Sequence, residues 1–340
     1  MGDSRTLEEE LEYRSKKSDD AKELWHRYGA MKAHLINQYY PWIQANCPWF
    51  TDHGEAHIDS VIRSASWLLL SRLPTKVKPK LTCLDLFLVL AAILWHDVGN
   101  VYSRTGHADI SKITNEIKAL GFPNVSIHRL VAEISKAHVG KAGLDIPKLN
   151  EICATSHDQH KVYTRALAAV LRFADEISEN RSRISQALLP SVPDSNRIYW
   201  EYANCISACK PEVGREEIVV EVEIPLDKVA TKFYCSDYPE LTDKEEKISL
   251  IHYILCRLEK MNTERVYCAG LFGQYTSIRH IVARFCIMQD TTRVDGYDLE
   301  LVLGDDGLQK DSYPEIPIVT KFFECNPNWQ PETLEEALLK

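Results

Sequence analysis

The chain has 340 residues, of which 45% are apolar and 26% are charged. These values exclude a disordered or collagen-like chain and predict one large globular domain or two. The 49 acidic and 40 basic residues give a net charge of −9. This charge argues against a broad nucleic-acid-binding surface, because such a surface needs clustered Lys and Arg.

Helical periodicity dominates the first two-thirds of the chain. Apolar residues recur at helical spacing over about 7–45, where Pro41 and Pro48 interrupt the pattern, and again over 55–71. Residues 84–96 are apolar nearly all round, which indicates a buried helix. Further helices are predicted near 107–120, 126–138 and 160–179.

A stretch rich in Pro, Ser and Asn at 189–196 marks a boundary, after which alternating patterns favour strands. We expect a hairpin of strands 197–207 and 216–224, then a helix over 241–262 opened by a capping box at Thr242. Further strands are predicted at 281–288, 297–303 and 318–325.

These elements predict a mainly α protein with two domains. A helical bundle over about 1–190 is followed by a smaller α+β domain over 197–340. The second domain carries no catalytic pattern. Its role stays open between a substrate lid, a dimerisation surface and a partner-docking face.

Histidines and aspartates gather at the ends of the predicted helices. His96 and Asp97 end the apolar helix, and Asp175 shares a helix side with Ala168 and Leu171. A carboxylate in such surroundings is costly to bury unless something neutralises it. A divalent cation held by imidazoles and carboxylates would neutralise both aspartates at once. For any single residue, a His–Asp hydrogen bond or an Arg-paired aspartate is the simpler alternative.

The order His57, then His96-Asp97, then Asp175, on successive helices, resembles the HD superfamily of metal-dependent phosphohydrolases. The segment AAILWHDVGN resembles the family's small-residue helix that ends in His-Asp-apolar-Gly. The segment LRFADEIS resembles the helix of its last ligand. The resemblance covers roughly residues 50–185 and looks closest to HD domains of bacterial conflict and defence systems, which implies a role in antiviral defence.

The resemblance implies a ligand set for one or two divalent ions, drawn from Mn, Fe, Ni, Co, Zn and Mg. Its primary ligands would be His57, His96, Asp97 and Asp175, with Asp97 bridging if two ions bind. His53 lies one turn before His57 and is a rival for the first position.

Two further histidines are implied at the site. His138 occupies the place of an extra ligand in two-metal members of the family. His107 is open between a second-metal ligand and an acid that protonates the leaving group, and the second role suits its spacing from His96 slightly better. The resemblance thus gives His107 and Asp97 catalytic roles.

Many family members carry a Lys directly after the His-Asp-apolar-Gly segment, where this chain has Asn100. Neutralisation of a substrate phosphate must therefore come from elsewhere. Arg172 stands out, because it lies three residues before Asp175 on nearly the same helix face and a bidentate Arg clamps phosphate well. The phosphate-binding candidates are Arg172, Lys136, Arg104 and Lys112.

The expected function is hydrolysis of a nucleotide-type phosphate ester or anhydride, with a nucleotide or other phosphorylated small molecule as partner. An HD-type single-strand nuclease is an alternative that the net acidity disfavours. A non-catalytic nucleotide-sensing or interaction module is another. The sequence leaves open whether the chain forms a homo-oligomer.

The ten cysteines are scattered and include no Cys-x-x-Cys pair. The longest apolar run, Leu86 to Trp95, is about half a membrane span, and the acidic N-terminus has no signal-peptide pattern. We therefore expect reduced thiols, no membrane contact and a cytoplasmic location.

Overall fold

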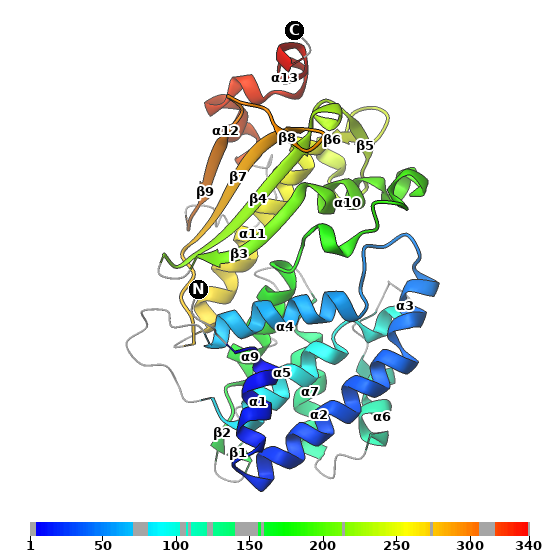
Figure 1. The fold of residues 1–340 in the computed structure, drawn as a ribbon, viewed down its shortest axis with the longest axis vertical. Coiled ribbons are helices and arrows are strands. Elements are labelled where there is room, and N and C mark those ends of the chain that lie inside the picture. The colour runs from blue at the N-terminus through cyan, green and yellow to red at the C-terminus, as the bar shows by residue number, and fades with distance from the viewer. Residues whose placement is uncertain are drawn as a thin grey trace. The chain divides into compact units, whose positions relative to one another are not determined.

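The structure is a computed structural model that describes residues 5–70, 81–102, 107, 110–120, 125–139, 156–157, 160–212, 215–272, 275–305 and 317–338. The chain forms two compact units, and Figure 1 shows the elements of each. The first unit comprises 1–48, 52–178 and 267–278, and the second comprises 49–51, 179–266 and 279–340. The helical unit thus includes a segment from far down the chain, whereas the sequence predicts a single domain boundary near residue 190.

The first unit is mainly helical, as predicted. The region 7–45 divides into three helices, and Pro41 lies in the first turn of the third one. The predicted helix at 160–179 begins only at Thr164. The elements of this unit are α1 (Leu7–Ser15), α2 (Asp19–Gln38), α3 (Tyr40–Asn46), α4 (Glu55–Leu70), α5 (Cys83–Trp95), η1 (Val98–Val101), α6 (Ile110–Ala119), α7 (Val125–Lys136), β1 (Ser156–His157), β2 (His160–Lys161) and α9 (Thr164–Glu176).

Helix α5 is the core of this unit, and α1, α2, α4, α7 and α9 all pack against it. It begins with a capping box between Thr82 and Asp85, and every residue from Asp85 to Trp95 is buried. The Trp95 indole N–H points to the Met31 sulfur at 3.0 Å. Among the described residues, one segment, Cys83–Val101, is long and apolar enough to cross a membrane. Since 89% of its most apolar window is buried inside the protein, it has the setting of a core helix.

The second unit contains a mixed sheet whose strands lie side by side in the order β3, β4, β7, β9, with β8 also paired to β7 (Figure 1). β3 and β4 are antiparallel, as the predicted hairpin requires, but β4 and β7 are parallel. A parallel pair needs a long crossover. The connection between β4 and β7 contains the small antiparallel pair β5–β6 and the long helix α11.

The strands of this unit are β3 (Ile206–Glu212), β4 (Glu217–Pro225), β5 (Lys232–Tyr234), β6 (Lys247–Ser249), β7 (His280–Gln289), β8 (Thr292–Arg293) and β9 (Leu299–Leu303). Its α-helices are α10 (Asp194–Cys205), α11 (Leu250–Phe272), whose last residues belong to the first unit, α12 (Pro317–Cys325) and α13 (Pro331–Leu338). Its short helical turns are η2 (Arg181–Arg183), η3 (Leu189–Ser191), η4 (Leu226–Lys228), η5 (Pro239–Leu241) and η6 (Pro327–Trp329).

Two predicted strands are helices. Residues 197–207 were expected to be a strand, but they belong almost entirely to α10, in which Arg197 and Glu201 form an i,i+4 ion pair at 3.2 Å. Residues 318–325 were also expected to be a strand, but they lie in α12, whose Phe322 ring packs against Phe285. Both predictions were wrong because a short apolar run fits either period, and packing then decides.

The capping box predicted at Thr242 was also wrong. The Asp243 carboxylate instead accepts the backbone N–H groups of Glu245 and Lys247, at 2.9 and 3.0 Å, and closes a turn. Helix α11 begins only at Leu250, where the Ser249 hydroxyl accepts the N–H of His252 at 3.3 Å. Local side-chain hydrogen bonds at an Asp compete with helix initiation in this way.

Glu259 on α11 gives the second unit a testable pH dependence. Burial raises the pKa of its carboxyl from 4.5 to about 7. The folded protein therefore binds an extra proton between these two values. Binding of this proton contributes its full share to the free energy of unfolding below about pH 4.5, and the contribution is lost as the pH rises through about 7.

We expect Glu259→Gln to unfold at a higher temperature than the wild type at pH 8 and at a similar temperature at pH 5. Thermal denaturation followed by circular dichroism at both pH values measures this difference. Glu335→Gln, at an exposed position of α13, is the control and should change neither transition. An equal shift at both pH values would show that protonation of Glu259 is not the cause.

Candidate metal centre

The start of α4 fixes His57. The two carboxylate oxygens of Asp52 accept the backbone N–H groups of Gly54 at 2.9 Å and of His57 at 3.3 Å. These bonds satisfy N–H groups that have no partner within the helix. His57 therefore lies in the first turn of α4, and its side chain is fully buried.

The end of α5 places the next two side chains. His96 follows the last helical residue, and its Nδ1 lies 2.7 Å from the carbonyl oxygen of Ile93. A carbonyl can only accept, so Nδ1 carries a proton, and Nε2 is the ring nitrogen that remains to bind a metal. His138, which follows α7, has the same arrangement, with Nδ1 2.6 Å from the carbonyl oxygen of Ser135. Metal-binding histidines are commonly oriented by such a bond to the second ring nitrogen.

Four side chains from three helix ends converge on one point. His96 Nε2 lies 3.2 Å from Asp97 Oδ2 and 3.7 Å from Asp175 Oδ1. His57 Nε2 lies 3.2 Å from Asp175 Oδ1 and 3.6 Å from Asp97 Oδ2. We call this group, formed by His57, His96, Asp97 and Asp175, the first half of the centre.

The other oxygen of Asp97 belongs to a second group. Asp97 Oδ1 lies 3.8 Å from His138 Nε2, which in turn lies 3.3 Å from His107 Nε2. One ligand atom from each of Asp97, His107 and His138 lies within 4.8 Å of the others, and the same holds for His57, His96 and Asp97. We call the group of Asp97, His107 and His138 the second half of the centre. Asp97 is shared by both halves, one oxygen to each.

The donor atoms fit a divalent cation. The Nε2 atoms of His57 and His96 are buried and have no hydrogen-bond partner in the described structure. They nevertheless lie 3.2–3.7 Å from carboxylate oxygens, which is the spacing of ligand atoms around a common ion. Imidazole nitrogen and carboxylate oxygen are ligands that Zn, Fe, Mn, Co and Ni accept. The buried His/Asp group can therefore hold a divalent metal.

The ionisation of the aspartates and of His96 depends on their proximity. Burial alone would raise the pKa of Asp97, but His96, His53 and His57 hold it well below its usual range. His57 and His96 outweigh burial in the same way and lower the pKa of Asp175. Burial alone would lower the pKa of His96, but Asp97 and Asp175 hold it well above its usual value. A proton on His96 thus offsets part of the negative charge of the two carboxylates.

His138 has the opposite shift. Burial and the neighbouring His96 lower its pKa to about 4, so its imidazole is neutral at pH 7. Only a neutral imidazole can ligate a metal. The second half of the centre therefore has a ligand-competent histidine across the physiological pH range.

The structure brings together most of the residues that the sequence singled out. His53 lies beside His57, with ring centroids 5.7 Å apart, but belongs to neither half of the centre. Lys136 is exposed. Arg172 is only 3% exposed, and its guanidinium donates to the backbone carbonyl oxygens of Val139 and Ala137. Arg104 and the side chain of Lys112 lie outside the described residues.

Two supporting residues were missed in the sequence. Asn100 was noted only for the absence of a Lys, yet its Nδ2 donates to Asp97 Oδ1 at 2.9 Å and orients the shared carboxylate. Asp52, described above, supports His57. The signals were local. Asn100 lies three residues after Asp97, in the short turn η1 that follows α5, and Asp52 lies two residues before Gly54, a common spacing for a turn closed by an Asp side chain.

Gly99 allows the close approach on which the second half depends. A Cβ atom built at this position would lie 1.7 Å from the carbonyl oxygen of His107. The backbone of His107 therefore passes directly over Gly99. This contact explains why Gly follows the His-Asp-apolar sequence here.

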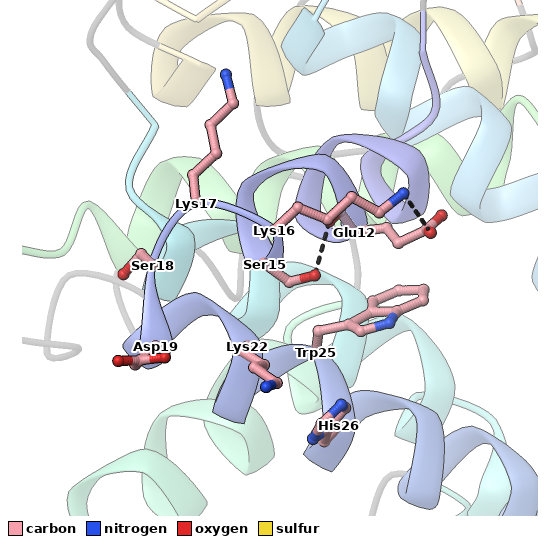
Figure 2. A pocket seen from close by; sticks show the side chains of 9 residues that line it. All are labelled: Glu12, Ser15, Lys16, Lys17, Ser18, Asp19, Lys22, Trp25 and His26. Atoms are coloured by element: carbon pink, nitrogen blue, oxygen red, sulfur yellow. Dashed lines mark hydrogen bonds and ion pairs between the residues drawn. The ribbon is translucent and has the colours of Figure 1, made fainter.

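A separate cavity of about 570 Å³ lies between the end of α1 and the start of α2. Figure 2 shows its lining side chains, among them Lys16, Lys17, Lys22 and Trp25. None of the residues that line it belongs to either half of the centre, and Lys16 is paired with Glu12 at 2.9 Å. This cavity is therefore distinct from the candidate metal centre.

Substitution of Gly99 tests the close approach. In Gly99→Ala the backbone of His107 must move, which should cost about 1–3 kcal/mol of stability, as overpacking does, and should weaken metal binding. Gly29→Ala is the control, because Gly29 is an exposed helical residue with no atom within 4 Å of an added Cβ. That change should stabilise the protein by about 0.5–1 kcal/mol. Urea denaturation measures the stability of each variant, and manganese titration measures its metal affinity. If Gly99→Ala and Gly29→Ala had the same stability and the same affinity, the close approach of His107 to Gly99 would not support the centre.

Metal binding should release a proton from His96. Because the carboxylates keep the pKa of His96 above its usual value, metal-free protein at pH 7 holds a proton that a cation must displace. We expect release of about one proton per first-half ion. Calorimetric titration with manganese in two buffers of unlike ionisation enthalpy measures this number. Identical heats in both buffers would show that no proton leaves.

The comparison with known proteins agrees with this geometry. A family model described as HD-CE matches residues 47–245, which is more than half of the chain and includes both halves of the centre. No curated protein and no solved structure matches the chain. The predicted resemblance to HD domains is confirmed, whereas a role in bacterial defence stays a prediction. The chain belongs to the HD-CE family, an HD-type domain, and its buried His/Asp group indicates a metal-dependent hydrolase.

Proposed function

We propose that this protein is a metal-dependent phosphohydrolase that cleaves a nucleotide-type phosphate ester or anhydride at a dinuclear centre. The observation that carries the proposal is the position of Asp97. One of its oxygens lies 3.2 Å from His96 Nε2, and the other faces His138 Nε2 at 3.8 Å. If two ions bind, Asp97 would be a ligand to both of them.

When bound, a pair of divalent ions supplies an activated water and a Lewis acid for the phosphoryl oxygen. The protein contributes charge balance. The four histidines of the centre are neutral as ligands and Asp97 and Asp175 are anionic, so two divalent ions leave a net charge of about +2. A phosphate dianion matches that charge, which supports a phosphate substrate over a neutral one.

Exposure gives the direction from which a substrate reaches the centre. The side chains of His57 and His96 are fully buried, whereas that of Asp175 is 28% exposed. His107 is also partly exposed. We infer that a substrate approaches the centre where Asp175 and His107 are partly exposed, and not past the buried His57 and His96. The exposed Lys136, two residues before His138, is the described cation we favour for contact with the phosphate.

The two roles left open for His107 differ in their geometric requirements. A ligand must point to the same ion as His138 and Asp97, whereas a proton donor must point to the leaving group. The 3.3 Å separation of the His107 and His138 Nε2 atoms favours the ligand role. This assignment makes the second half a site of three ligands.

The substrate class rests on charge and on the family. The net charge of −9 disfavours a nucleic-acid polymer, because polymer binding gains its free energy from clustered cations. A mononucleotide or dinucleotide needs only a local phosphate site. We therefore favour deoxynucleoside triphosphates, nucleoside monophosphates and cyclic or linear dinucleotides as substrates.

A product analysis tests the proposal. The protein is incubated with each of these nucleotides and with a single-stranded oligonucleotide, in the presence of Mn, Mg, Ni or Co, and the products are resolved by ion-exchange chromatography. We expect metal-dependent release of phosphate, pyrophosphate or triphosphate from at least one nucleotide. Asp97→Asn should abolish it, and His26→Ala, at an exposed position of α2, should leave it unchanged.

Three results would contradict the proposal. Degradation of the oligonucleotide alone would identify a nuclease. Tight nucleotide binding without any product would identify a sensing module. Turnover that persists in Asp97→Asn would show that the reaction does not use this centre.

A further inference from the structure

The end of α7 determines where His138 lies. The helix ends at Lys136, and Ala137 and Val139 then flank the histidine. Carbonyl groups in the last turn of a helix have no partner within it and need donors from elsewhere. The Ser135 carbonyl orients the His138 ring, and the anchoring of the backbone on both sides of His138 sets where that ring lies.

Arg172 on α9 supplies a donor to two carbonyls that lie just past the end of α7. Its Nη1 lies 3.2 Å from the carbonyl oxygen of Val139 and 3.4 Å from that of Ala137. A cation at the C-terminus of a helix also interacts favourably with the helix dipole. Because Arg172 is only 3% exposed, this interaction is poorly screened by solvent.

A segment from far down the chain completes the arrangement. The guanidinium carbon of Arg172 lies 5.2 Å from the centroid of the Tyr267 ring, which is within the range of cation–π attraction. Tyr267 belongs to α11 and to the 267–278 segment that joins the first unit. In the same segment, the Phe272 ring packs on Phe173 of α9 at 5.8 Å. Arg172 and its neighbour Phe173 thus pack on residues of the 267–278 segment, within the first unit.

We propose that Arg172 is a positioning residue for His138. Its buried guanidinium, held over Tyr267, caps the carbonyls on both sides of His138 and fixes that histidine in the second half of the centre. The residue thus acts through the metal ligand and not on the substrate phosphate. This inference rests on the proposed dinuclear function. It also gives the 267–278 segment a role in the metal centre.

Metal titration of the full chain tests the proposal without any substrate. Manganese binding is measured by electron paramagnetic resonance and calorimetry for the wild type and for Arg172→Met, Arg172→Lys and Tyr267→Leu. We expect the wild type to bind two ions. Arg172→Met should bind the second ion roughly 10–100-fold more weakly, the usual effect of losing an outer-shell partner, and the first ion with unchanged affinity. Arg165→Met, an exposed position on the first turn of α9, is the matched control and should behave as the wild type.

Arg172→Lys and Tyr267→Leu distinguish a loss of His138 positioning from a general loss of stability. Arg172→Lys keeps a charge and one donor, so it should recover part of the affinity for the second ion. Tyr267→Leu removes the ring beneath the guanidinium and should weaken the second ion while sparing the first. If Arg172→Met does not fold, these two variants decide the matter. Loss of both ions to the same extent, or wild-type affinity for both, would overturn the proposal.

The outcome can be distinguished from failure of the proposed function. A wild type that binds two ions but turns over no nucleotide would refute the function and leave the role of Arg172 intact. A wild type that binds a single ion would refute the second half and the positioning role together. If Arg172→Met binds both ions normally but has a raised KM, Arg172 is instead a phosphate-binding residue, and the positioning role is wrong.

Discussion

A buried carboxylate needs compensation on both oxygens, and Asp97 obtains it from two different groups of histidines. Oδ2 faces His57 and His96, while Oδ1 faces His138 and accepts a hydrogen bond from Asn100. Without these partners an ionised aspartate at the end of the most apolar helix would be prohibitively costly. His57 and His96, which help to lower its pKa, are also among the residues that can hold metal, so stability and chemistry depend on one arrangement.

The helical unit is organised around that requirement. Core helix α5 presents His96 and Asp97 at its end, and α4, α7 and α9 pack against it and contribute His57, His138 and Asp175 at or near their own ends. Helix ends carry unpaired backbone groups, and hydrogen bonds to these groups orient the site. The carbonyl oxygen of Ile93 accepts from Nδ1 of His96, and the Asp52 carboxylate accepts from the backbone N–H of His57. The candidate metal ligands are therefore positioned by helices and by the hydrogen bonds at their ends.

Strong periodicity was predictable and weak periodicity was not. The buried helix at 84–96 and the strands near 216–224 and 281–288 were expected because many residues agree on one period. The regions 197–207 and 318–325 were misjudged because a few apolar residues fit a strand or a helix equally well. Packing partners such as Phe285 for Phe322 resolved the second case, and such partners cannot be identified from local spacing.

By itself, the sequence determined the helical character of the first unit and the identity of the histidines and aspartates at its helix ends, because these follow from local pattern. Only the tertiary structure decided how they are grouped. That Asp97 faces two sets of histidines, that Gly99 lies under His107 and that Asn100 orients Asp97 are consequences of packing between segments distant in the chain. Arg172 is the clearest example. Spacing alone put it beside Asp175 as a phosphate ligand, whereas its burial against Ala137, Val139 and Tyr267 turns its charge toward backbone carbonyls.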